Sequence, residues 1–247
     1  MKLIKTFRSP NFNKRKANQK ISYLVLHYTA IASCQESLNY LCDKENKVSA
    51  HFLVSKNGEI YYLVDLKNNA WHAGESYWQG LINLNNYSIG IEIDNSGPHI
   101  YNENYQDLQI KNLCKLIKKL IKEFNILPKN VLGHSDIAPF RKIDPGEKFP
   151  WYKLNSNKLS YLPNIHTNIL YNQSNVIKKD YLYSQTLEVL NMLGIIGYDT
   201  RGIKVEDSKF ELLIKAYQRH YRQSNVSGQI DQETISLIKQ HYKDVLT

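Results

Sequence analysis

The chain has 247 residues, of which 42% are hydrophobic, and it carries a formal net charge of +9. This length is enough for one medium-sized domain and a smaller one, each with a packed core. A basic chain can bind nucleic acid or another anionic polymer, but these lysines are scattered rather than gathered in blocks, which argues against nucleic acid. No apolar run reaches the roughly 18 residues that a membrane span needs.

The cysteines and the N-terminal residues bear on the cellular compartment. An odd number of cysteines without C-x-x-C spacing argues against a disulfide framework and predicts reduced thiols at Cys34, Cys42 and Cys114. The first ten residues lack the apolar region of a signal peptide. We therefore expect a cytoplasmic protein; the alternative is a periplasmic protein, or one exported by a route that the sequence does not reveal.

The first chemical signal along the chain is a histidine at the end of a strand. Residues 21–27 are apolar on both faces, which is typical of a central strand, and His27 closes this run. In open α/β sheets the carboxyl ends of the strands face the ligand crevice, so His27 is a candidate metal ligand. The alternative role is a histidine that only hydrogen-bonds a loop carbonyl.

A short helix over residues 35–41 and a hairpin over residues 49–64 are predicted next. The dipeptide Asn57-Gly58 between two apolar runs is a strong hairpin signal. Small residues then flank Trp71 and His72 in the sequence A-W-H-A-G at 70–74, which predicts a loop that lets a ligand approach the backbone. The alternative role for Trp71 is to anchor this loop to the core.

A strand, a helix and a second strand then form a predicted β-α-β unit. Residues 88–94 alternate, with isoleucines on one face and Glu92 on the other. Burying Glu92 is unfavourable unless a cation lies nearby, and the alternative is a solvated glutamate on an exposed face. An amphipathic helix over 106–124 leads to a strand over 130–134. The crossover predicts that the two strands are parallel and allows them to be adjacent, which brings Glu92 near His134.

Residues 133–151 concentrate metal-binding and charged side chains. Three prolines in this segment predict a shaped loop rather than a helix. His134 and Asp144 offer an imidazole and a carboxylate, both of which suit zinc. Lys142 lies two residues before Asp144, so in an extended chain both side chains point the same way and place a cation where an acyl-transfer oxyanion would form. Together with His27, these residues predict a metal site at one edge of a sheet.

Several motifs together resemble the zinc-dependent N-acetylmuramoyl-L-alanine amidases of the AmpD/AmiD type, a family that shares its fold with peptidoglycan recognition proteins. In chain order they are L-H-Y-T at 26–29, S-A-H-F-L-V at 49–54, A-W-H-A-G at 70–74, S-I-G-I-E-I at 88–93, and G-H-S-D-I-A-P with R-K-I-D-P-G and F-P-W across 133–151. The resemblance implies an α/β fold, with a central mixed β-sheet flanked by helices. Phe140 departs from the pattern, because a small or polar residue is expected there.

The resemblance implies a role for each candidate residue. It implies one Zn²⁺ per chain, held by His27, His134 and Asp144, with Glu92 as general base and Lys142 as the residue that stabilises the oxyanion. It implies a substrate groove lined by Trp71, His72, Ala73 and Arg141. The implied reaction is hydrolysis of the amide bond between N-acetylmuramic acid, in its 1,6-anhydro or ordinary form, and L-alanine of peptidoglycan or muropeptides, in cell-wall turnover or recycling.

The rest of the chain predicts a small domain of three helices. We expect a catalytic domain over 1–155, a linker packed on it over 156–178, and a helical domain over 179–247. The helical signals are an apolar stripe over 187–193 that ends at Gly194, a capping box from Ser208 to Glu211, and a helix capped by Asp231.

Part of this helical region resembles the peptidoglycan-binding domain of cell-wall hydrolases. The matching residues are A-Y-Q-R-H-Y-R at 216–222, followed by G-x-I-D-x-x-T at 228–234. The alternative is a helical appendage that only stabilises the catalytic domain. Arg219, His220 and Arg222 are expected either to meet acidic stem peptides or to face water.

Three other functions fit part of the pattern. A peptidoglycan recognition protein that binds without cutting typically lacks one zinc ligand, whereas this chain has all three candidates. A zinc peptidase could use a similar ligand set but does not account for all the motifs, and a nucleic-acid binder gives Glu92 no role. The absence of a leader favours recycling of 1,6-anhydro-muropeptides, whereas a second domain favours longer glycan strands.

Overall fold

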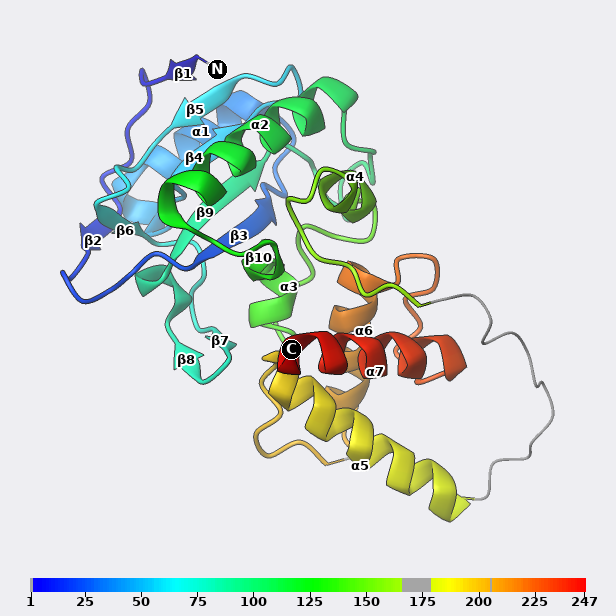
Figure 1. Cartoon of the computed structure of the whole chain (residues 1–247). Helices are drawn as coiled ribbons and strands as arrows, with labels where there is room; N and C mark the ends of the chain where they lie inside the picture. Colours follow the sequence, from blue (N-terminus) through cyan, green and yellow to red (C-terminus); the bar gives the residue numbers. More distant parts are fainter. Residues whose placement is uncertain (1, 166–178, 205) are drawn as a thin grey trace.

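The computed structural model describes residues 2–165, 179–204 and 206–247 (Figure 1). Its central element is a six-stranded mixed sheet with the strands in the order β1 (Leu3–Ile4), β5 (Ile60–Tyr62), β4 (Phe52–Val54), β9 (Ser88–Ile93), β3 (Tyr23–Tyr28) and β10 (Val131–Gly133). The four neighbours β4, β9, β3 and β10 run parallel, and β5 runs antiparallel to β4, as the predicted hairpin requires. Two short ribbons pair β2 (Phe12–Lys14) with β6 (Asn68–Ala70), and β7 (Tyr77–Trp78) with β8 (Leu81–Ile82).

Helices cover both faces of the sheet. In Figure 1, α2 (Asp107–Phe124) lies in front of the sheet and α1 (Cys34–Cys42) behind it. The other α-helices in the described residues are α3 (His134–Ile137), α4 (Trp151–Ser156), α5 (Lys179–Ile196), α6 (Ser208–Tyr221) and α7 (Gln232–Leu246). Short 3₁₀ turns occur at η1 (Lys44–Asn46), η2 (Leu84–Asn86) and η3 (Pro128–Asn130).

The alternation of side chains along the central strands decides which face carries which core. Leu24 and Leu26 of β3 belong to the core that includes α2, and so do all three isoleucines of β9. Successive residues of a strand point to opposite faces. His27 and Glu92 therefore lie together on the face that α2 does not cover.

The C-terminal helices pack against this second face. A single apolar cluster joins Val25 and Leu132 of the sheet to residues of α5, α6 and α7, among them Leu193, Leu213 and Ile238. Burial of apolar surface is the main favourable term in such packing. The predicted bundle of three helices is therefore present, and it shares a core with the sheet.

The structure corrects one expectation for the central segments and decides a point that the sequence left open. Residues 133–151 are not entirely a loop, because α3 forms at His134–Ile137, before the first proline of the segment. Its first turn is stabilised by the Asp136 carboxylate, which accepts a hydrogen bond from the Gly133 N–H at 2.7 Å. The strands β9 and β10 are parallel, as predicted, but they are not adjacent, because β3 lies between them and pairs with both.

Two expectations for the C-terminal helices also change. The helix predicted to end at Gly194 continues to Ile196, and Gly194 allows Thr200 to pack closely, since a Cβ there would lie 2.8 Å from Thr200 Oγ1. The capping box at Ser208 is not formed, because Asp207 occupies the N-cap and Ser208 begins the helix.

Other expectations are confirmed or lie beyond what the structure describes. Asp231 caps α7 by accepting a hydrogen bond from the Thr234 N–H at 3.0 Å. The three cysteines are free, two on α1 and one on α2. Much of the predicted linker, residues 166–178, lies outside the described residues, and the boundaries at 155 and 179 stay predictions.

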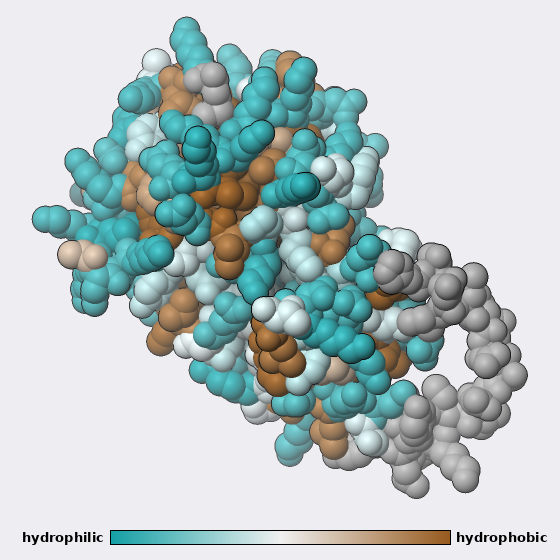
Figure 2. Space-filling model, viewed as in Figure 1, coloured by the Kyte–Doolittle hydropathy of each residue, from teal (hydrophilic) through white to brown (hydrophobic). Residues whose placement is uncertain are grey.

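The visible surface is mainly hydrophilic, with apolar residues in separate patches over both the sheet and the helices (Figure 2). Within the described ranges, no helix has the length and apolar character needed to cross a membrane.

Protonation of the buried His51 should make folding pH-dependent. Its Nδ1 accepts the Gly90 N–H at 3.0 Å, and its Nε2 lies 3.1 Å from the Asn68 carbonyl, so the native state holds a neutral imidazole. Burial lowers the pKa of His51 to about 3. Because the unfolded histidine titrates near 6.5, the unfolded state binds more protons between these values, and stability falls as the pH falls from about 6.5 towards 3.

We expect His51→Gln to flatten this pH dependence. With a chelator present throughout, urea unfolding between pH 4 and 6 should give a free energy of unfolding whose slope is shallower by about 1.4 kcal/mol per pH unit than that of the wild type. Equal slopes for the two proteins would show that His51 is not the group responsible.

Candidate active site

Two of the predicted site residues are direct neighbours on the parallel strands β3 and β9. His27 of β3 and Glu92 of β9 are register partners. They lie towards the carboxyl ends of their strands, where open α/β sheets carry their ligand sites. His134 follows directly after β10, which pairs with the other side of β3.

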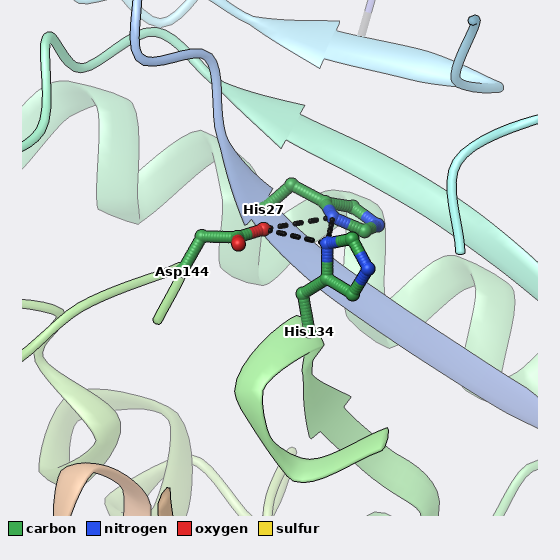
Figure 3. A group of neighbouring side chains, drawn as sticks. All are labelled: His27, His134 and Asp144. Atoms are coloured by element: carbon green, nitrogen blue, oxygen red, sulfur yellow. Dashed lines mark hydrogen bonds and ion pairs between the residues drawn. The ribbon is translucent and has the colours of Figure 1, made fainter. Parts of the chain in front are cut away.

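Three buried side chains converge at this edge (Figure 3). His27 Nδ1 lies 2.9 Å from His134 Nδ1, and each of these nitrogens lies 3.0 Å from Asp144 Oδ2. The three residues form a group that could hold a metal ion, with ligand atoms within 4.8 Å of one another. Asp144 is held next to α3, because its carbonyl accepts the Ser135 N–H at 2.9 Å.

The partners of the two Nε2 atoms, in His27 and His134, show which ring nitrogens carry protons. His134 Nε2 lies 3.1 Å from the Ala73 carbonyl, to which it must donate. His27 Nε2 lies 3.1 Å from His72 Nδ1, His72 Nε2 lies 3.2 Å from Ser88 Oγ, and Ser88 donates to the Leu84 carbonyl at 2.5 Å.

This chain of donors fixes the tautomers of the histidines. It places a proton on Nε2 of both His27 and His134, so that both Nδ1 lone pairs face the carboxylate. Three acceptors about 3 Å apart without a proton between them fit a metal ion, and two imidazoles with one carboxylate suit zinc.

The charges in the site keep these groups in the form that binds a metal. Burial, together with the nearby His134 and Lys142, lowers the pKa of His27 to about 4, so the imidazole is neutral at pH 7. Burial alone would raise the pKa of Asp144, but positive charge on His134 and His27 and hydrogen bonds from them outweigh burial and hold that pKa well below its usual value. When both Nδ1 atoms are unprotonated, a bound cation would supply this positive charge instead. Asp144 is therefore an ionised carboxylate.

Glu92 is electrostatically distinct from Asp144. Burial, and then the negative charge of Asp144, raise the pKa of Glu92 well above its usual value, while Lys142 acts in the opposite direction. The Oε2 atom of Glu92 is buried and has no hydrogen-bond partner among the described residues. A carboxylate with a raised pKa and a free oxygen can accept a proton and return it.

Two predicted groove residues are buried beside the metal-binding group, and their contact with substrate stays a prediction. His72 exposes 5% of its surface and contacts His27, and Ala73 is fully buried with its carbonyl on His134. The sequence could not show this, because it depends on how closely the loop approaches β9. Gly90 permits that approach, since a Cβ there would lie 2.3 Å from the His72 ring.

The other two predicted groove residues lie nearer the surface, and their contact with substrate stays a prediction. The Trp71 indole donates a 2.8 Å hydrogen bond to Oδ1 of the exposed Asn13 in β2, so this bond ties the loop to the surface ribbon and not to the core. Arg141 is exposed and donates to the carbonyls of Ala73 and Glu75 at 2.9 and 2.6 Å. It thereby ties residues 73–75 to the segment that carries Lys142.

The structure also shows the contacts of Phe140, His220 and Arg222, whose roles the sequence left open. Phe140 packs against the apolar cluster of the C-terminal helices, with Lys209 over its ring. Neither role expected for His220 is correct, because it is buried against Asp136. Arg222 likewise is mostly buried, in ion pairs with Asp231 and Glu233.

Replacement of His72 should weaken metal binding without removing a ligand. His72→Phe keeps a ring but loses the acceptor for His27 Nε2, and loss of such a partner typically lowers metal affinity by about 10–100-fold. The measurement is zinc affinity by competition with a chelator. His51→Phe is the matched control, because His51 is an equally buried histidine that contacts no residue of the triad. A similar loss in both variants would point to general destabilisation.

A sequence profile described as N-acetylmuramoyl-L-alanine amidase matches residues 17–147, more than half of the chain. The chain belongs to the N-acetylmuramoyl-L-alanine amidase family. The enzyme class predicted from the sequence motifs is thereby confirmed.

Individual proteins that are similar to this amidase support the same family assignment. It is 36% identical over 230 residues to the amidase AmiD of Escherichia coli, covering 88% of this chain and 81% of AmiD. It is 35% identical over 162 residues to the 1,6-anhydro-N-acetylmuramyl-L-alanine amidase AmpD of Haemophilus influenzae, which covers 58% of this chain and 86% of that protein.

Solved structures confirm the fold of the amidase along nearly its whole length. The complex of E. coli AmiD with the substrate anhydro-N-acetylmuramic acid-L-Ala-D-γ-Glu-L-Lys has a TM-score of 0.75 at 31% identity, covering 95% of this chain and 98% of AmiD. AmpDh3 of Pseudomonas aeruginosa has a TM-score of 0.77 at 28% identity, covering 99% of this chain and all of that one. The predicted α/β fold, a mixed sheet flanked by helices, is confirmed.

Proposed function

We propose that this amidase uses one Zn²⁺, held by His27, His134 and Asp144, to hydrolyse the amide bond between N-acetylmuramic acid and L-alanine in muropeptides. The observation that carries the proposal is the buried set of three acceptor atoms with Glu92 as the register neighbour of His27. The substrate present in the E. coli AmiD complex favours a 1,6-anhydro-muropeptide as the ligand of this chain.

The chain's own residues have separable tasks in this reaction. A bound Zn²⁺ would supply Lewis-acid chemistry and lower the pKa of a water molecule at its open position to about 7. Glu92 accepts the proton of the attacking water on its unpaired oxygen, and its raised pKa lets it pass that proton to the leaving amine of L-alanine. Lys142 supplies positive charge for the oxyanion that forms on the amide carbonyl.

Two rival functions make different demands on the same residues. A recognition protein that binds muropeptides without cutting them needs neither a free oxygen on Glu92 nor a complete ligand set, and both are present. A zinc peptidase would cut within the stem peptide and leave its first bond intact. The structural likeness to AmiD across 95% of this chain favours the amidase.

Digestion of defined muropeptides tests the proposal. Substrates with 1,6-anhydro and with reducing N-acetylmuramic acid ends are incubated with the protein, with a chelator, and with the chelator followed by zinc. We expect mass spectrometry to show a free stem peptide that begins with L-alanine, which the chelator abolishes and zinc restores.

The other outcomes identify the rivals. Shorter fragments of the stem peptide would indicate the peptidase. Binding without release would indicate the recognition protein. The ratio of the rates on the two substrates measures the preference for the anhydro form.

The division into domains belongs to the same proposal. We assign residues 1–155 to catalysis, residues 156–178 to a linker, and residues 179–247 to a helical domain that resembles a peptidoglycan-binding domain. If that domain holds glycan, the protein should cosediment with insoluble peptidoglycan even after Glu92→Gln has stopped cleavage.

A further inference from the structure

We propose that the C-terminal helices position the metal site, because Tyr198 and His220 hold Asp136, the residue that fixes the start of α3 and therefore His134. This inference rests on the proposed zinc site and adds two residues from outside the amidase motifs to its support. It gives the helical region a task inside the active site, whether or not that region also binds glycan.

Asp136 is fully buried and receives donors from both parts of the chain. Its Oδ2 accepts the Gly133 N–H at 2.7 Å, which forms the first turn of α3. The same oxygen lies 2.6 Å from His220 Nδ1, and its Oδ1 accepts the Tyr198 hydroxyl at 2.7 Å. Two of these three donors come from the C-terminal helices and the turn that joins them.

The two donors are held firmly in place. The His220 ring stacks on Trp151, with centroids 3.6 Å apart and an angle of 18° between the rings. Its Nε2 has no hydrogen-bond partner within the described ranges, so among these residues the ring is hydrogen-bonded through Nδ1 to Asp136. The Tyr198 ring packs edge-on against Trp78, at 4.9 Å.

The backbone next to Tyr198 is also locked to the first part of the chain. The Gln79 N–H donates to the Gly197 carbonyl at 2.9 Å, and the Gln79 side chain donates to the Ile196 carbonyl at 3.2 Å. A Cβ at Gly197 would lie 2.7 Å from the Trp78 ring, so this contact requires glycine. These contacts fix the position of the helical region against the β7–β8 ribbon.

The contact of Tyr198 and His220 with Asp136 can affect the metal site, because α3 is too short to be stable alone. A single helical turn fixes several backbone dihedrals for one hydrogen bond, so isolated turns do not persist in water. His134 is the first residue of α3, and the Ser135 N–H also holds the Asp144 carbonyl. Two of the three acceptor atoms therefore depend on the turn that Asp136 stabilises.

Tyr198→Phe tests the proposal, with Tyr161→Phe as a matched control. Both changes delete a phenol that donates to a carboxylate, in one case to Asp136 and in the other to Asp244 of α7, at 2.5 Å. The second change perturbs the C-terminal helices without touching α3. His220→Phe is a further variant, because it keeps a ring to stack on Trp151 but loses the donor.

The measurements are zinc affinity by chelator competition and the absorption spectrum of the cobalt-substituted protein, with circular dichroism to confirm folding. We expect Tyr198→Phe and His220→Phe to weaken zinc binding by roughly 3–10-fold, less than the loss of a direct partner of a ligand, and to shift the cobalt bands. Tyr161→Phe should do neither.

The outcomes separate this proposal from the proposed function. If folded Tyr198→Phe and His220→Phe bind zinc as the wild type does, or if Tyr161→Phe weakens binding equally, the positioning role is wrong while the zinc amidase stands. If the wild type itself fails to bind zinc in the competition, the proposed metal site is wrong, and the positioning role falls with it.

Discussion

Glu92→Gln should lower the rate of muropeptide hydrolysis by about 10²–10⁴-fold, the range typical of losing a general acid-base group. Glutamine keeps the shape of the side chain but cannot accept a proton at the oxygen that Glu92 leaves without a partner. The loss should appear in kcat, because the group acts on the reacting water rather than on the bound glycopeptide. The measurement is release of stem peptide under saturating substrate.

The zinc content of the Glu92→Gln protein must be measured to interpret its loss of hydrolysis. The variant should hold as much zinc as the wild type, since Glu92 is not one of the three ligands. Glu103→Gln is the control, because Glu103 is an acidic side chain that binds Lys56 and the Ser96 N–H and contacts no residue of the triad. Unchanged turnover in a zinc-loaded Glu92→Gln protein would remove Glu92 from the reaction.

Asp144→Asn should weaken zinc binding by about 10²–10⁴-fold, which corresponds to the roughly 3–5 kcal/mol lost when one partner of a buried charge pair is removed. The amide has nearly the volume of the carboxylate but carries no charge to offset a divalent cation between two imidazoles. Hydrolysis should fall in parallel at limiting zinc. Competition with a chelator measures the affinity.

Asp94→Asn provides the comparison for this change. Asp94 is a buried aspartate that directly follows β9, but it accepts the Lys56 N–H and takes no part in the triad. We expect its variant to bind zinc normally. Retention of tight zinc binding by Asp144→Asn would mean that the ion does not need this carboxylate.

Local patterns in the sequence were enough to predict the strands that carry the site. The alternation around Glu92 and the apolar run before His27 indicated two strands whose carboxyl ends meet, and the register of β3 and β9 confirms that these residues are neighbours. The helix over 106–124 was predicted almost to the residue, because its apolar stripe is long and regular.

The supporting residues could not be predicted in the same way. The small neighbours of His72 predicted a loop that a ligand can approach, whereas its contact with His27 depends on Gly90 of β9, where a Cβ would meet the His72 ring. His220 looked like a surface cation because it lies between arginines, yet it meets Asp136 across 84 residues. Asp136 did leave a signal, since an acidic residue three positions after Gly133 is a helix-start pattern.

The separation of the ligands along the chain has a consequence for folding. His27 lies 107 residues from His134 and 117 from Asp144, and the two parts meet only when β10 pairs with β3. Closing so long a loop is a late and slow step in folding. A chain that is still being synthesised cannot hold the ion before that pairing, so zinc capture would stabilise only the completed sheet and could be followed as a kinetic signal of its completion.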